Sequence, residues 1–299
     1  MEVKNYIFAG LDFIFDKKGN PWFLEANYFP GGAYHIEDLY GKDTIVKELA
    51  KKMKDYNNPC MLIAKRSDSR IYNSTYIAEK LKEYMDIKMC YAEPNFRRKS
   101  SLITTENKKI KSNCILRYDQ KLNNHFEKNS LVINSNLIEK VVNDKMLTLK
   151  IVNERTNVNV PRSFYVKSKK EMEKILEKEE FEEGFVIKPN DLTEGIDVLV
   201  LTNKEKLPII RSKRVFEERI SPKKKEGRYW DVRVYIINGK YMGGFIRESR
   251  KRVTNISIGA KPYKIPPKIN RILRSPSLKV VAAIDKYCEE KRRKRRKSR

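Results

Sequence analysis

Histidine and cysteine are scarce in this sequence of 299 residues. There are two histidines, His35 and His125, and four cysteines, at positions 60, 90, 114 and 288. No pair of cysteines has the C-x-x-C spacing of a zinc site, and nothing in their spacing indicates a disulfide framework. We therefore expect buried, reduced cysteines and no zinc centre.

Long apolar runs are absent as well. No stretch approaches the 18 apolar residues of a transmembrane helix, and no secretory apolar segment is visible. Together with the unpaired cysteines, this pattern predicts a cytoplasmic protein with no membrane partner. Because 40% of the residues are hydrophobic, the chain can still fill a core between two or three layers.

Acidic residues are outnumbered by basic ones. The 39 Asp and Glu face 65 Lys and Arg, which gives a net charge of +26. Eight of these positive charges lie in the last nine residues, and without them the net charge is still +18. Anionic substrates, phosphates, nucleic acid or an acidic protein surface are natural partners. We expect residues 291–299 to form a disordered basic tail, with a nucleic-acid or ribosome contact as the alternative.

The first third of the chain predicts a hairpin followed by an α/β unit. Residues 3–29 combine aromatic and β-branched residues with the turn sequence DKKGNP, which predicts a β-hairpin. Residues 38–56 have the apolar spacing of one helix. A strand at 60–64, a helix at 74–85 and a strand at 87–92 then predict a βαβ unit.

The second half predicts mainly antiparallel strands. A helix near residue 150 and a charged helix after residue 168 precede several strands, of which the last two meet at an Asn238-Gly239 turn. The proline-containing segment 260–276 has no clear periodicity, so we expect a loop there. Residues 278–291 predict a final helix.

Three polar side chains of the first hairpin suggest a metal site. With the turn centred between Lys18 and Gly19, Asp12 lies directly opposite Glu25. Since strand side chains alternate, Asn27 falls on the same face. Two carboxylates and an amide oxygen, with no interleaved Lys or Arg, suit a hard cation such as Mg²⁺. A solvated polar hairpin face is the alternative.

These residues lie in a segment that resembles a known family. Residues 9–32, AGLDFIFDKKGNPWFLEANYFPGG, are similar to the C-terminal catalytic strand pair of ATP-grasp ligases. The resemblance implies that Asp12, Glu25 and Asn27 hold one or two Mg²⁺ ions, with Mn²⁺ as an alternative. It also implies an α+β fold in which antiparallel sheets and helices form a nucleotide cleft, beside a small parallel α/β domain that precedes the ATP-grasp domain.

Downstream segments resemble the rest of the family pattern. Lys145 and Lys188 match its two ATP-binding lysines, and the resemblance implies that Lys188 and Arg247 are catalytic. The remaining matches imply contacts to adenine, ribose, phosphate or substrate, and they are Glu218, Arg219, Ile220, Asp231, Arg233 and Asn255. The loop at 190–197 departs from the pattern because only Gly195 remains where several glycines are common, which puts loop closure in question.

The matched segments occur in rotated order. Residues 1–57 correspond to the metal hairpin and its helix, residues 58–140 to the small α/β domain, and residues 141–290 to the nucleotide-binding part. Three explanations stay open: a circular permutant, a chain cut from neighbouring modules, or a site completed between subunits of a homo-oligomer. Packing of the hairpin outside the cleft that holds the two lysines would contradict the first.

The resemblance implies an ATP-dependent carboxylate–amine ligase that works through an acyl phosphate. Its pattern is closest to glutathione-synthase-like enzymes and ribosomal-protein glutamate ligases, so glutamate is one candidate amino acid. The basic composition favours anionic peptide or small-molecule substrates. Two alternatives are a basic nucleic-acid or ribosome-binding protein and an ATP-grasp module that binds nucleotide without ligating.

Overall fold

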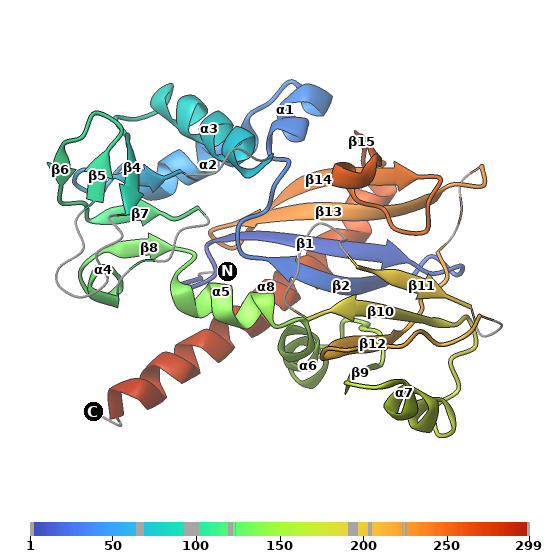
Figure 1. Ribbon diagram of the computed structural model, residues 1–299. Helices are drawn as coiled ribbons and strands as arrows, with labels where there is room; N and C mark the ends of the chain where they lie inside the picture. The colour runs from blue at the N-terminus through green and yellow to red at the C-terminus, as the bar shows by residue number, and fades with distance from the viewer. Residues whose placement is uncertain are drawn as a thin grey trace.

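The computed structural model shows three sheets and the helices that cover them (Figure 1). It describes residues 3–63, 69–92, 102–118, 122, 124–190, 197–202, 205–222, 224 and 226–297. No helix in these ranges is long and apolar enough to cross a membrane. The Gly-poor part of the loop at 190–197, residues 191–196, lies outside them.

A five-stranded antiparallel sheet contains the N-terminal hairpin. Its order is β15-β14-β13-β1-β2, so β1 of the hairpin pairs with β13. The strands are β1 (Phe8–Phe15), β2 (Pro21–Asn27), β13 (Tyr229–Ile237), β14 (Lys240–Ser249) and β15 (Lys261–Lys264). The predicted turn between β13 and β14 is confirmed: Asn238 and Gly239 both have positive φ, at 49° and 75°.

Two further sheets complete the framework. A four-stranded antiparallel sheet, in the order β11-β10-β12-β9, contains β9 (Ser163–Val166), β10 (Phe185–Pro189), β11 (Leu199–Leu201) and β12 (Arg214–Glu218). The six-stranded sheet contains β3 (Cys60–Leu62), β4 (Lys88–Ala92), β5 (Leu102–Thr104), β6 (Lys109–Ile110), β7 (Cys114–Leu116) and β8 (Leu131–Ile133). In it β3 pairs parallel with β4, as the βαβ prediction requires.

The helices connect these sheets and cover their faces. They are α1 (Tyr34–Tyr40), α2 (Thr44–Met53), α3 (Ser69–Lys82), α4 (Asn124–Asn129), α5 (Asn136–Asn143), α6 (Lys145–Arg155), α7 (Lys169–Leu176) and α8 (Pro267–Lys297). The prediction of one helix over 38–56 is wrong. Gly41 ends α1 in the left-handed conformation, with φ of 63°, and α2 begins three residues later.

Helix α8 differs from its prediction at both ends. It begins at Pro267, inside the segment expected to be a loop, and continues through Pro276. A proline suits the first helical position because the N–H there has no intrahelical partner. At the other end the helix reaches Lys297, where we expected a disordered tail. Lys and Arg are good helix formers, and extending an existing helix costs far less than starting one.

The N-terminal segment is fixed to α8 and to the small α/β domain. The backbone N–H groups of Asn5 and Tyr6 donate to Asp285 Oδ1 at 2.6 and 2.8 Å, and that of Lys4 donates to the same carboxylate. The Asn134 side chain accepts from Phe8 N at 3.2 Å and donates to Phe8 O. The N-terminal end of β1 is therefore held by two groups of residues that are far away in the sequence.

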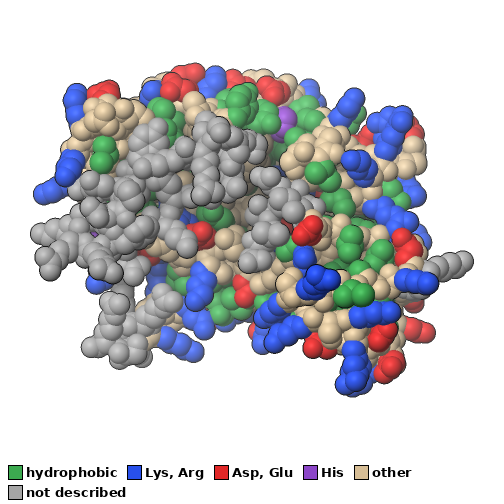
Figure 2. Space-filling model, viewed as in Figure 1, with side chains coloured by type: hydrophobic (Ala, Val, Ile, Leu, Met, Phe, Trp, Pro, Cys, Tyr) green, Lys and Arg blue, Asp and Glu red, His purple; other side chains and the backbone are tan. Residues whose placement is uncertain are grey.

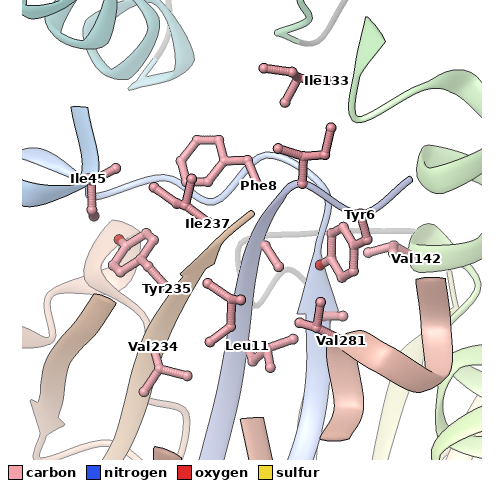
Figure 3. Packing of buried hydrophobic residues seen from close by; sticks show 14 of the residues in the cluster. Tyr6, Phe8, Leu11, Ile45, Ile133, Val142, Val234, Tyr235, Ile237 and Val281 are labelled. Carbon is pink, nitrogen blue, oxygen red and sulfur yellow. The ribbon is translucent and has the colours of Figure 1, made fainter. Parts of the chain in front are cut away.

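The hairpin also contributes to the main hydrophobic core. Figure 3 shows Tyr6, Phe8 and Leu11 beside residues of α8, α5 and β13. Each of these three side chains is completely buried. Burying an aromatic or leucine side chain stabilises the fold by about 2 kcal/mol. The hairpin is thus an integral part of this chain's fold.

Candidate active site

A cleft lies between the five-stranded and four-stranded sheets. The cavity in it has a volume of about 160 Å³ and is continuous with open solvent. The residues on its walls come from both ends of the sequence and include Asp12, Glu25, Lys145, Lys188, Glu218, Arg219, Ile220, Asp231, Arg247 and Asn255. The structure therefore brings together most of the residues that the sequence singled out.

The hairpin register places Asp12 opposite Glu25, which confirms that part of the prediction. The turn itself differs from the prediction. It is centred on Lys18 and not between Lys18 and Gly19, as the pairing of Phe15 with Pro21 shows. A bulge between Asp12 and Phe13 then shifts the register by one residue and leaves Leu24 without a partner in the ladder. Leu24 lines the cleft, and no local pattern in the sequence predicted this.

Asp12 is paired with two arginines. Arg233 donates to both of its carboxylate oxygens, at 2.8 and 2.7 Å, and Arg247 Nη2 lies 3.0 Å from Oδ2. Burial opposes ionisation of Asp12, but the two guanidinium groups outweigh it and hold the pKa of the carboxyl well below its usual value. The expectation of a metal face without an interleaved arginine is wrong, because Arg233 lies directly opposite Asp12 on β13.

Asp231 binds the second arginine of this network. Its carboxylate accepts two bonds of 2.7 Å from Arg247 and one from Thr254. Burial raises the pKa of Asp231 above its ordinary value even though Arg247 is bound. With its oxygens engaged in this way, Asp231 is better suited to holding Arg247 than to the ribose contact that the resemblance implied.

Lys188 faces a buried carboxylate on the opposite wall. Its Nζ lies 2.8 Å from Glu217 Oε1, and both residues are more than 90% buried. Burial raises the pKa of Glu217 despite this partner. Sequence reasoning missed Glu217 and chose its neighbour. The signal lies in the strand pairing, because Lys188 is opposite Val215 and Glu217 is on the same face, two residues on.

Lys145 and Glu218 have different surroundings. Lys145 is the first residue of α6, is about nine-tenths buried, and lines the cleft. The Glu218 carboxylate is turned toward Arg162, whose Nε lies 3.1 Å from it. Its side chain therefore forms an ion pair with Arg162, while Arg219 and Ile220 line the cleft beside it.

The hairpin residues fit a hard cation in their donor chemistry. Asp12 and Glu25 share one face, and Asn27, two residues beyond Glu25 on β2, has an amide oxygen that can serve as a ligand. Asp12 keeps spare lone pairs beside its arginines because a carboxylate offers about four acceptor sites. No described group of three or more His, Cys, Asp or Glu side chains could bind a metal. An amide oxygen is thus needed to complete this set.

A second cavity adjoins the cleft. It shares Glu25, Lys145 and Asn255 with the cleft and extends toward α1, α3 and α5. Arg233 lines only this second cavity. Asn255, whose side chain caps the short helix at Ile256–Ile258, stands where the two spaces meet. The two spaces therefore share part of their lining.

Comparison with known proteins gives a family and a fold. Residues 142–285 match the model of the RimK-like ATP-grasp domain. The fold is similar to that of a putative gamma-glutamylcysteine synthetase from Methylobacillus flagellatus, with a TM-score of 0.62 and 10% identity over 97% of this chain and 90% of that one. A glutathione synthetase-like effector from Globodera pallida covers 83% of this chain and 74% of its own, with 10% identity and a TM-score of 0.46.

No curated protein matches the sequence. The domain match supports an ATP-dependent ligase of the amide-forming kind in general, and the antiparallel sheets with their covering helices confirm the predicted fold class. Residues 142–285, just under half of the chain, are thus similar to a RimK-like ATP-grasp domain.

Proposed function

We propose that the protein joins a carboxylate to an amine at the expense of ATP, through an acyl phosphate. One observation carries this proposal: the N-terminal hairpin brings Asp12 and Glu25 into the same cleft as Lys145 and Lys188. Carboxylates for a cation and lysines for phosphate oxygens are the groups that phosphoryl transfer needs.

The reaction is balanced without a protein nucleophile. A carboxylate oxygen attacks the terminal phosphorus of ATP, and ADP leaves. The amine nitrogen then attacks the acyl carbon, phosphate leaves, and one proton is released. Mg²⁺ at Asp12, Glu25 and Asn27 would neutralise phosphate charge when bound.

The protein's own residues position and neutralise the reactants. Lys145 and Lys188 offset the charge of phosphate oxygens as point charges. Asp231 holds the guanidinium of Arg247 by two hydrogen bonds, and this fixes the direction of the remaining donors. Arg247 can then stabilise oxygens of the acyl phosphate from a preset position.

The arrangement of the hairpin supports a permuted order within one chain. The hairpin pairs with β13, and Asp285 of α8 binds its leading segment. Neither contact requires a second subunit. We accordingly propose that residues 1–57 complete the nucleotide site of their own molecule.

Titration calorimetry with ATP, with and without Mg²⁺, tests the nucleotide site. An ADP-release assay with hydroxylamine as a general amine then tests the chemistry, because hydroxylamine converts an acyl phosphate into a hydroxamate. Magnesium-dependent ATP binding and carboxylate-dependent ADP release are expected. Binding without ADP release from any carboxylate would favour a module that binds nucleotide only.

The alternative of a nucleic-acid-binding protein predicts a different result. On the face in Figure 2, Lys and Arg side chains are scattered among Asp and Glu rather than gathered into one patch. Tight, salt-sensitive binding to RNA or DNA without magnesium-dependent ATP binding would favour this alternative. The same calorimeter, loaded with a single-stranded oligonucleotide at low and physiological salt, distinguishes the two.

A further inference from the structure

The second cavity has a position that identifies one of the two substrates. It meets the nucleotide cleft at Glu25, Lys145 and Asn255. In the proposed reaction, the carboxylate must reach the terminal phosphate first, whereas the amine attacks afterwards. The space next to the phosphate end of the cleft is therefore the place for the carboxylate substrate.

Aromatic rings form one side of this cavity. His35 packs between Tyr34, at a ring-centroid distance of 4.0 Å, and Phe245, at 5.2 Å. Both His35 and Phe245 face the glycine pair after the hairpin: a methyl group placed on Gly32 would lie 3.0 Å from Phe245 Cζ and 3.3 Å from His35 Cδ2. The two rings thus pack closely against Gly32, which has no side chain.

A second aromatic group lies at the small α/β domain. Tyr28 and Phe29 follow directly after β2, and Tyr118 follows β7. Phe29 and Tyr118 meet edge to face, with ring centroids 3.7 Å apart. All three residues line the cavity together with the first group. Aromatic side chains therefore line the cavity both from the segment that follows the hairpin and from the small α/β domain.

Two buried polar atoms point to a bound ligand. Asn27 Nδ2 and His35 Nε2 have no hydrogen-bond partner, although each atom is inaccessible to solvent. An unpaired buried donor destabilises the protein, and a ligand that accepts a hydrogen bond from it removes that cost. Burial lowers the pKa of His35 below its ordinary value, so this imidazole is neutral at pH 7 and offers a hydrogen bond without a charge.

The described cations of the cavity are already committed to other groups. Arg233 donates both Nε and Nη2 to Asp12. Lys145 lies at the junction with the nucleotide cleft, where it would meet the reacting carboxylate and the phosphates. Among the residues that the structure describes, no other Lys or Arg lines the cavity, so a second carboxylate on the substrate would be poorly matched.

We propose that this cavity binds the carboxylate substrate and that the substrate carries an aromatic or similarly flat apolar group. An aromatic amino acid or an arylalkyl carboxylate has this chemistry, whereas glutamate and aspartate do not. The proposal rests on the proposed function for the identity of the reacting group. Flat rings bind favourably to Tyr, Phe and His by stacking or by meeting them edge to face.

Substrate preference is the first test. Hydroxamate and ADP formation are measured with MgATP, hydroxylamine and one carboxylate at a time: L-phenylalanine, L-tyrosine, 3-phenylpropionate, L-glutamate or L-aspartate. We expect kcat/KM for the aromatic carboxylates to exceed that for the dicarboxylates at least about tenfold, the effect of 1.4 kcal/mol. A preference for glutamate or aspartate would overturn the proposal and leave the ligase function standing.

Two substitutions test whether this cavity is responsible. Gly31→Ala adds a methyl group 3.4 Å from Asn73 Nδ2, which is an ordinary contact, so the fold is kept while the cavity is narrowed. His35→Leu removes the neutral imidazole. Each is expected to raise KM for the aromatic carboxylate about tenfold while KM for ATP stays within about twofold. His125→Leu, at the exposed second histidine of the chain, is the matched control.

Direct binding separates failure of the inference from failure of the function. The thermal unfolding midpoint is measured with 3-phenylpropionate and with glutamate in the presence of MgADP. A rise with 3-phenylpropionate that Gly31→Ala abolishes supports the proposal even when no carboxylate releases ADP, and in that case only the ligase function fails. Absence of both binding and turnover with aromatic carboxylates overturns the proposal.

Discussion

The two walls of the nucleotide cleft carry opposite charge. The wall on the five-stranded sheet combines Asp12, Glu25 and Asp231 with Arg247, while Arg233 binds Asp12 from the adjoining cavity. On the other side, two lysines face one buried carboxylate, that of Glu217. One wall is therefore suited to cations and the other to phosphate oxygens, so a nucleotide with its metal ions matches the pair better than either wall alone.

The walls also differ in how firmly their charges are held. The arginines of the first wall are bound by forked pairs of hydrogen bonds, which fix the position of the guanidinium. Lys188 is held by one contact to Glu217 through a flexible stem. The acidic wall is thus a rigid frame, while the lysines can follow the phosphates as they move.

Removing charge from the acidic wall should have the largest effect. Glu25→Gln keeps the shape of the side chain but takes away a carboxylate that faces the cleft. We expect ADP release to fall about 10³-fold, because losing one charge partner of a transition state costs several kcal/mol. Magnesium-dependent ATP binding, followed by calorimetry, should weaken too.

Glu106→Gln, a change at an exposed residue in the small α/β domain, is the control for this experiment. It should leave ADP release unchanged. Unaltered ADP release in Glu25→Gln would mean that the hairpin does not serve the cleft, and the comparison of the two walls would then fail.

Breaking the ion pair between Lys188 and Glu217 should have the next largest effect on ADP release. Lys188→Met leaves Glu217 buried without its cation, so we expect a loss of about 10²-fold in ADP release and of about 3 kcal/mol in the free energy of unfolding. Adding Glu217→Gln should restore most of the stability but none of the activity. Recovery of activity in the double variant would show that Lys188 is structural only.

Removing the hydrogen bonds between Asp285 of α8 and residues 4–6 should lower the stability of the fold without changing any residue of the cleft. Asp285→Ala leaves the N–H groups of Asn5 and Tyr6 buried without their acceptor, so we expect a loss of about 2–4 kcal/mol in the free energy of unfolding. Urea unfolding followed by circular dichroism measures it. Asp55→Ala, at an exposed residue, should change the stability far less, and an equal loss in both would refute the anchor.

The buried Glu217 should make stability depend on pH. Its pKa is raised in the folded protein, so the folded state binds this proton more tightly than the unfolded state does. The protonated Glu217 therefore stabilises the folded state fully at pH values below 4.5, the ordinary pKa of a glutamate. This stabilisation is lost as the pH rises above 4.5. In Glu217→Gln, the decline in unfolding free energy between pH 4.5 and 7 should be shallower than in the unchanged protein, by at most about 1.4 kcal/mol per pH unit.

The smallest effect is expected from an exposed pair at the rim. Arg252 Nη1 lies 3.1 Å from Glu205 Oε2, and both side chains are about 40% exposed. The backbone and hydroxyl of Thr202, followed by Arg252, lower the pKa of Glu205 to about 2. Because water and salt screen such a pair, Arg252→Ala should leave the thermal unfolding midpoint unchanged within error. A large shift would show that the rim holds the walls together.

Sequence reasoning succeeded where one segment contained the whole pattern. Asp12 and Glu25 lie on the same hairpin and were predicted as a pair, although the observed pairing depends on the bulge that shifts the register by one residue. It failed where a distant strand supplied the partner: Arg233 lies beside Asp12 only because β13 adds to the hairpin. The bulge at Leu24 and the choice of Glu217 over Glu218 also depend on neighbouring strands that local patterns do not identify.

Two errors in the predicted helices also have different causes, one in tertiary packing and one in a local signal. Prolines in 260–276 indicated a loop by local rules, yet Leu273 and Val280 bury α8 against the sheets and the helix continues through Pro276. Gly41 was a local signal that could have been used to split α1 from α2. For α8, burial of its apolar side chains outweighed the low helix propensity of proline. For α1 and α2, the prediction did not use the tendency of glycine to end a helix.

The bond between Asp285 and residues 4–6 has a consequence for how the protein comes into being. These partners are about 280 residues apart in sequence. During synthesis the hairpin leaves the ribosome first and must wait for α8 before its leading segment can dock. Contacts of such long range form late and slow folding. In a nascent chain the strands that carry the lysines would therefore be complete before the acidic wall is anchored, and the cleft would become competent only after α8 has been made.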